Sequence, residues 1–385
     1  MKSKKTPLFM LPLLCVQLLA ASPSGTQVAS NTTALEYGWS FACCIKTDAK
    51  DKAKCQEKIA VAYLSDGLPA EAHDLAQQIE GWRRGVLHAD LAAYYAEHGN
   101  DVEALKSLAR AKLDLRTESE WRKERIEQHI ELAQAYMGML PDAEATGGKP
   151  NEWLQIYAEL SSANPESWSN SLAPLLSMNL EVPAEEWEFN IWSTQQYLSL
   201  SQHTALDQDA RRLVLKKAYE SAGLVPGWKS FDFKLQVIRA LAPAGEKTNA
   251  GEWLDAVAAQ LMGLRLPDFV KVPLLIQAAE AATACGRSDA FQDVAGMAEE
   301  LIETLQAIEQ PAALAQLAKA YANAGMKPKS IEGYDRALEI ASALENPRPR
   351  AMAYVDICLA FDGTEGIALG SFSDRLDTGL KGFNP

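Results

Sequence analysis

Three cysteines within thirteen residues are the side chains with the clearest chemical potential in this chain. Cys43, Cys44 and Cys55 could form one local disulfide or supply thiolates to a metal. A metal site would need a fourth ligand, and the nearest histidine in the sequence is His73. In an oxidising compartment the spacing therefore favours a disulfide between Cys55 and either Cys43 or Cys44, and which of them pairs stays open.

The other polar residues match no catalytic pattern. The five histidines include no His-Glu-x-x-His, and the chain has no Gly-x-Ser-x-Gly elbow and no phosphate-binding Gly-x-x-x-x-Gly-Lys loop. Adjacent acids such as Glu299 and Glu300 point about 100° apart on a helix, so they do not converge on one atom. We therefore expect no enzyme, no metal and no cofactor.

Tryptophan is concentrated between residues 150 and 228. Five of the nine lie there, namely Trp153, Trp168, Trp187, Trp192 and Trp228. Indoles fill wide gaps between helices or line a groove, and filling of the core is the favoured interpretation. In the alternative, Trp187, Trp192 and Trp228 would be partly exposed in a sugar-binding groove beside at least two carboxylates.

Residues 314–341, LAQLAKAYANAGMKPKSIEGYDRALEIA, show what kind of element positions these side chains. The apolar positions of the first half, at i, i+3 and i+7, are Leu314, Leu317 and Tyr321. Gly325 stands where this helix must end, and Pro328 stands just inside the start of a second one. The spacing predicts two short helices folded back on each other.

This stretch resembles a tetratricopeptide repeat, a helix-turn-helix unit of about 34 residues. The matching positions are Leu314, Leu317, Ala318, Tyr321, Gly325, Ser330, Tyr334 and Ala337. It departs from the family in Leu314 for the usual Trp, Ser330 for Ala, and Ser342 where a closing Pro is common. The resemblance implies stacked helix pairs with an extended surface for a protein or peptide partner.

The pattern recurs along the chain. Two adjoining copies lie in residues 52–117, where Tyr63 and Gly67 are followed 32 residues later by Tyr95 and Gly99. Looser copies turn at Gly245 and Gly286. Strand signals are nearly missing, so we predict an all-α fold, an α-solenoid of antiparallel helix pairs resembling a tetratricopeptide superhelix, with an irregular C-terminal tail.

Five segments are expected. They are a signal peptide and short linker (1–30), N-terminal tetratricopeptide-like repeats (31–140), a divergent Trp-rich helical segment (141–230), C-terminal tetratricopeptide-like repeats (231–365) and an irregular tail (366–385). At the start of the third segment, PDAEATGGKP at 141–150 has no apolar stripe and predicts a loop.

The first segment has the layout of a cleaved secretory signal. A basic start precedes an apolar run from Pro7 to Ala21, which is about fifteen residues where a membrane-spanning helix needs about twenty. Cleavage is expected after Ala21 or near Ala29, and Leu14 argues against lipidation of Cys15. We expect an exported protein, periplasmic or secreted, with no membrane span once the signal is removed.

The net charge of the chain limits the classes of partner that it is expected to bind. The formal charge is −14, and removing three leader lysines with no acidic residue would leave −17. Such a surface repels phosphate backbones, so no nucleic-acid partner is expected. The expected function is a non-catalytic, exported helical-repeat protein that mediates protein–protein interaction or scaffolding. A carbohydrate-binding or carbohydrate-active helical protein with a groove in 150–228 is the alternative.

Overall fold

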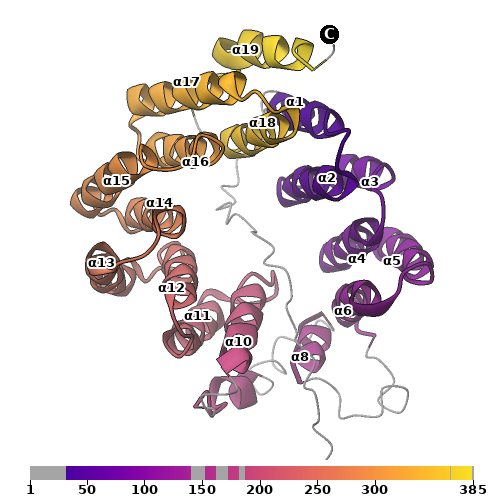
Figure 1. The fold of residues 1–385 in the computed structure, drawn as a ribbon. Coiled ribbons are helices and arrows are strands. Elements are labelled where there is room, and N and C mark those ends of the chain that lie inside the picture. Colours follow the sequence, from indigo (N-terminus) through magenta and orange to yellow (C-terminus); the bar gives the residue numbers. More distant parts are fainter. Residues whose placement is uncertain (1–31, 140–151, 162–171, 182–186, 365, 384–385) are drawn as a thin grey trace, which may run out of the picture. The chain divides into compact units, whose positions relative to one another are not determined.

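The computed structural model describes residues 32–139, 152–161, 172–181, 187–364 and 366–383 (Figure 1). Every regular element in these residues is an α-helix, which confirms the all-α prediction for the described part of the chain. None of the described helices is long and apolar enough to cross a membrane. The predicted signal segment, the loop at 141–150, Trp168 and the exact cleavage site lie outside the described residues.

The helices fall into two compact units, each described separately below. The middle unit comprises the described residues of His88–Glu246, and the terminal unit those of Leu19–Leu87 and Lys247–Pro385. The boundary between Leu87 and His88 falls within helix α4, Trp82–Glu97. The five segments predicted from sequence character are not tested by this division, and their boundaries stay a prediction.

Besides the second half of α4 and a short helix at residues 172–176, the described part of the middle unit contains six longer helices. They are α5 (Asp101–Leu115), α6 (Glu120–Tyr136), α8 (Glu152–Ser161), α10 (Trp187–Leu200), α11 (Gln208–Gly223) and α12 (Trp228–Leu241). Successive helices pack as neighbours: α5 contacts α6, α6 contacts α8, α10 contacts α11 and α11 contacts α12. Each described helix therefore buries one side against its neighbour in sequence.

The terminal unit joins helices from both ends of the described chain. They are α1 (Thr32–Cys43), α2 (Ala49–Ser65), α3 (Pro69–Ala76), α13 (Lys247–Gly263), α14 (Asp268–Cys285), α15 (Ser288–Ile302), α16 (Gln310–Asn323), α17 (Lys327–Ala343), α18 (Pro347–Phe361) and α19 (Gly370–Lys381). Helix α1 lies beside α18 (Figure 1), and the Phe41 and Tyr354 rings stack with centroids 4.3 Å apart. A Cβ added at Gly38 of α1 would lie 2.6 Å from Cδ1 of Ile59 on α2 and 3.2 Å from Cβ of Cys358 on α18, so glycine allows α1 to approach both helices closely.

Five glycines that the sequence marks as turns all adopt the left-handed backbone. They are Gly67, Gly99, Gly245, Gly286 and Gly325, with φ between 71° and 92°. A residue with a Cβ is strained at such φ values, so glycine ends each helix without that cost. Beside them, Asn100 caps α5 by accepting a hydrogen bond from the Glu103 amide, and Pro328 lies in the first turn of α17. Paired helices are confirmed on either side of three of these glycines, where α2 contacts α3, α14 contacts α15 and α16 contacts α17.

Small residues bring the paired helices close together. At Gly333 in α17 an added Cβ would lie 2.9 Å from the Cβ of Ala318 in α16, which leaves no room for a larger side chain. Tyr321 and Tyr334 are buried, at 4% and 0% exposure. The alanines and aromatics of residues 314–341 therefore form the packed interior of a helix pair.

The prediction of an irregular C-terminal tail is wrong over most of its length. Residues 370–381 form α19, whose Phe372 and Leu376 are both 2% exposed. The tail's glycines suggested irregular structure, yet Gly379 permits a close approach, because an added Cβ would lie 2.7 Å from the Tyr354 ring of α18. Two apolar residues at i and i+4 are a weak sequence signal, and only packing against Tyr334 and Phe361 makes them a helix face.

Candidate functional site

The three clustered cysteines lie around the junction of α1 and α2. All described cysteines are free thiols in this structure; Cys43 is exposed and Cys55 is 3% exposed. Gln56, next to Cys55, places its Nε2 3.7 Å from the Cys43 Sγ. A disulfide between Cys55 and Cys43 or Cys44 stays a prediction. Within the described ranges, no three His, Cys, Asp or Glu side chains converge as a metal site would require.

The tryptophans of the middle unit differ in exposure. Trp153 is 2% exposed and lies edge-on to Trp192, with centroids 5.8 Å apart. Trp187 and Trp228 are 37% and 43% exposed. Trp153 is therefore a core residue, whereas the two exposed indoles keep the groove hypothesis open for Trp187, Trp192 and Trp228.

A second aromatic cluster of the middle unit surrounds a buried histidine. The His203 ring stacks on Tyr136 at 5.0 Å with parallel planes, and Tyr157 lies beside both rings. Burial lowers the pKa of His203, with an opposing contribution from Glu97. The backbone amide of Ala205 donates to its Nδ1 over 3.2 Å, so a neutral imidazole with its proton on Nε2 fits this environment. The His203 ring therefore packs the turn after α10 against the tyrosines of α6 and α8.

The terminal unit contains a buried pair of carboxyl groups that no sequence motif predicted. Asp66 ends α2 and Asp362 ends α18, each directly followed by a left-handed glycine. The two side chains are within hydrogen-bonding contact, and Asp362 is only 4% exposed. The ammonium of Lys319, on α16 and 7% exposed, donates to the Asp362 backbone carbonyl over 2.7 Å. Three helices therefore meet around two carboxyls and one lysine.

The electrostatics of this carboxyl pair favour a bound proton. Burial raises the pKa of Asp362 to about 8, helped by the Asp66 charge and hydrogen bond and opposed by Lys319. Burial also raises the pKa of Asp66. Both groups end helices, where the backbone dipole further disfavours negative charge. One shared proton converts a repulsive contact into a hydrogen bond, so the pair can take up and release a proton near neutral pH.

Hydroxyl groups complete the surroundings of the pair. The Tyr334 hydroxyl donates to the Ala360 carbonyl over 3.0 Å and lies 2.8 Å from the Thr364 hydroxyl. Tyr63, on α2, is 5% exposed, and burial raises its pKa to about 12, with further contributions from Glu36 and Asp362. The tyrosines therefore stay neutral while the carboxyl pair titrates.

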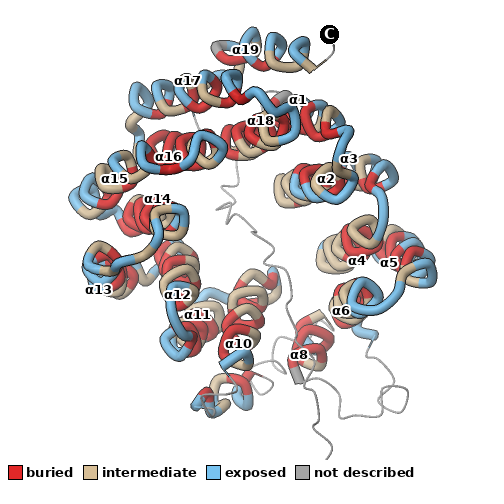
Figure 2. Tube along the Cα trace, viewed as in Figure 1, coloured by how far each residue is buried: buried red, intermediate tan, exposed pale blue. Residues whose placement is uncertain are grey.

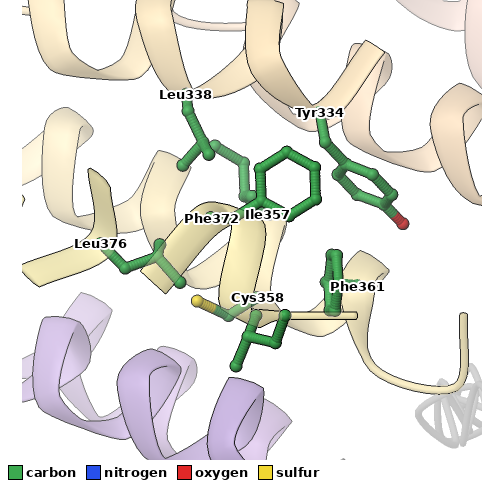
Figure 3. Close-up of a pocket in the computed structure, with 8 residues that line it drawn as sticks. Tyr334, Leu338, Ile357, Cys358, Phe361, Phe372 and Leu376 are labelled. Atoms are coloured by element: carbon green, nitrogen blue, oxygen red, sulfur yellow. The ribbon is translucent and has the colours of Figure 1, made fainter. Parts of the chain in front are cut away.

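Two hollows lie among α17, α18 and α19. The first is apolar, has a volume of about 10 Å³ and is lined by residues that include Tyr334, Phe361 and Phe372 (Figure 3). This volume is about that of one water probe, so it is a packing gap and not a ligand site. The second, of about 620 Å³, is a shallow surface depression lined partly by Arg350, Arg375 and Glu339. Arg375 is paired with Asp335 at 3.0 Å, so that part of the lining is already engaged.

An exposed apolar strip runs along α5 in the middle unit. It consists of Val102, Leu105, Ala109 and Leu113, and this set is called the α5 strip below. Val102, Leu105 and Leu113 are 63%, 49% and 61% exposed, while Ala104, Leu108 and Ala111 on the opposite side are buried. Figure 2 shows buried and exposed positions alternating along α5. Contiguous exposed apolar residues on a helix are typical of an interaction surface.

Comparison with known proteins gives no relative for this chain: no family model matches it, and neither a curated protein nor a solved structure is similar to it. The tetratricopeptide resemblance therefore rests on the residues and helix pairs described above.

The residues that sequence reasoning missed left only faint signals. Asp66 and Asp362 each stand in an Asp-Gly pair at a helix end, and Lys319 interrupts the alanine-rich run of residues 313–322. A lysine among alanines is commonly exposed, and only the fold brings a carbonyl within its reach. The α5 strip is visible as i, i+3, i+7 and i+11 spacing, but the buried residues of the same helix show a similar spacing.

Proposed function

We propose that this chain is an exported, non-catalytic helical-repeat protein that binds a protein or peptide partner. The observation that carries the proposal is the α5 strip, because a stable protein seldom leaves three large apolar side chains of one helix about half exposed or more. A tetratricopeptide-like solenoid is the architecture proposed for the stacked pairs. Support comes from the five left-handed turn glycines and the close contact of Gly333 with Ala318.

Export rests on the leader pattern of residues 1–30. We propose a periplasmic or secreted protein whose signal is cleaved, so that the acidic mature chain works outside the cytoplasm. Amino-terminal sequencing of the protein recovered from its native compartment tests this, and a chain that still begins at Met1 would contradict it.

Crosslinking from inside the strip tests the interaction proposal. A photoreactive phenylalanine analogue replaces Leu113 in the full chain, expressed in the source cells and irradiated there. The matched control carries the analogue at Leu213 of α11, a leucine of similar exposure at 53%. The proposal predicts a polypeptide adduct at position 113 and a much weaker one at 213. Equal labelling at the two positions, or no adduct at 113, would contradict it.

Carbohydrate binding is the second candidate, favoured by the partial exposure of Trp187 and Trp228. Titration with soluble oligosaccharides, followed by tryptophan fluorescence, separates it from the first. A saturable change that disappears in the double variant Trp187→Ala and Trp228→Ala would support it. No change with any glycan would exclude that groove.

A further inference from the structure

The α5 strip is bordered by basic residues in an otherwise acidic protein. At 100° per residue the strip spans an arc of about 80°, with Lys106 and Arg110 on one side and Lys112 on the other. Arg116 follows at the C-terminal end. All four basic residues are exposed. The net charge of the chain is −14, so this concentration of positive charge is local.

Acidic residues are few along α5 after its first turn. From Ala104 to Thr117 the only acid is Asp114, which is 7% exposed and faces inward. Nearer the helix start, Glu103 pairs with Lys106 at 2.6 Å, and this exposed pair neutralises one end of the strip. Toward the C-terminal end of α5, Leu113 therefore lies beside the exposed basic side chains of Lys112 and Arg116.

The shape of the strip suits another helix. Leu105, Ala109 and Leu113 form one i, i+4, i+8 ridge, with a small residue between two large ones. Ridges of this kind fit the grooves of a second helix that crosses at about 50°, and a central alanine allows close approach of the axes. Opposite charge on the borders of the partner would complete the contact and set its orientation.

We propose that the exposed face of α5 binds an acidic amphipathic helix of a partner protein. This inference rests on the proposed function and specifies the chemistry of its partner. A membrane containing anionic lipids is the other surface that basic amphipathic helices meet. It is disfavoured because the strip contains no aromatic side chain and the net negative charge of the protein repels such lipids.

A matched pair of labelled peptides tests the charge requirement. Each has about 18 residues, five helical turns, with leucines at i, i+4 and i+7 flanked by glutamates in one peptide and by lysines in the other. Fluorescence anisotropy with the full chain is expected to give binding at least about tenfold tighter for the acidic peptide, weakening as salt is raised. Equal affinity for the two peptides would overturn the inference.

Variants place the binding on α5. The double variant Leu105→Ser and Leu113→Ser should weaken acidic-peptide binding by about tenfold or more, and Lys112→Gln with Arg116→Gln should reduce both affinity and salt dependence. Leu213→Ser, at an exposed leucine of α11, should leave binding unchanged. Circular dichroism checks that each variant is folded. If the α5 variants bind as the unmodified chain does, the inference fails.

Vesicles of phosphatidylglycerol in phosphatidylcholine test whether the exposed face of α5 binds an anionic membrane instead of a helix. Sedimentation of the chain with these vesicles, lost in the serine double variant, would assign the face to membranes and overturn the inference. The crosslinking experiment distinguishes failure of this inference from failure of the proposed function. A polypeptide adduct at position 113 that maps to a basic or neutral segment of the partner would support the proposed function. The same result would overturn the inference that the partner is an acidic helix.

Discussion

Asp66 and Asp362 bring two helix C-termini, from α2 and α18, into contact through their carboxyl groups. Asp362 is 4% exposed, and Lys319 holds its backbone carbonyl at 2.7 Å. Within the terminal unit, the contact links α2, from the N-terminal part of the sequence, to α18, from the C-terminal part. Because two carboxylates repel each other, its strength depends on whether the pair holds a proton.

Asp362→Asn should change how stability depends on pH. The folded-state pKa of Asp362, about 8, lies above the ordinary value of 3.8, so the protonated pair contributes most below about pH 4. This contribution is lost as the pH rises toward 8. Asparagine keeps a hydrogen bond without the charge, so the variant should gain on the order of 2 kcal/mol over the unmodified chain at about pH 9. Urea unfolding from about pH 5 to pH 9 measures this difference.

The surface pair between the same helices provides the control. Lys58 and Asp356 also link α2 to α18, at 2.8 Å, but both side chains are substantially exposed. Asp356→Asn should cost at most about 1 kcal/mol, with no gain at high pH. If Asp356→Asn and Asp362→Asn have the same pH profile, the buried pair is not the titrating contact.

The sequence predicted local structure much better than the contacts between distant residues. Gly99 and Gly325 could be assigned to turns because a left-handed residue at a helix end is a local requirement. The Asp66 and Asp362 contact could not be found, because it depends on α2 and α18 lying together. Helix α19 was missed for a related reason: its Gly379 fits against Tyr354, which is distant in sequence.

Two glycine-to-alanine variants should have opposite effects. Gly286 ends α14 with φ of +71°, and a Cβ added there would meet no atom within 4 Å, so Gly286→Ala should destabilise by about 1 kcal/mol through backbone strain alone. Gly296 lies inside α15, also with open space, and Gly296→Ala should stabilise by about 0.5–1 kcal/mol. Thermal unfolding of both variants tests the assignment; two shifts of the same sign would be inconsistent with it.

Removing Asp90 should weaken the middle unit. Its carboxylate lies 2.6 Å from Nδ1 of His129, whose side chain is 1% exposed. Asp90→Ala leaves that buried nitrogen without its acceptor, which should cost about 1–3 kcal/mol, whereas Asp90→Asn retains an oxygen and should cost less. Hydrogen exchange in α4 and α6 reports the loss locally. If both variants show the same protection as the unmodified chain, the contact contributes little.

Thiol reactivity should separate the cysteines by burial and should test the predicted disulfide. In the reduced chain at about pH 8, Cys43 is exposed and should alkylate first, whereas burial raises the pKa of Cys55 and of Cys285 to about 11. Burial also raises the pKa of Cys358. Because the thiolate is the nucleophile, Cys55, Cys285 and Cys358 should react only after unfolding.

Under the proposed export to an oxidising compartment, a bridge from Cys55 to Cys43 or Cys44 should form while the chain folds, before burial protects Cys55. Peptide mapping without reductant identifies the pair, and Cys55→Ser should leave both partners open to alkylation. Recovery of all three as free thiols from an oxidising compartment would rule the bridge out. The exposed Cys43 would then be left available for a bond to another molecule.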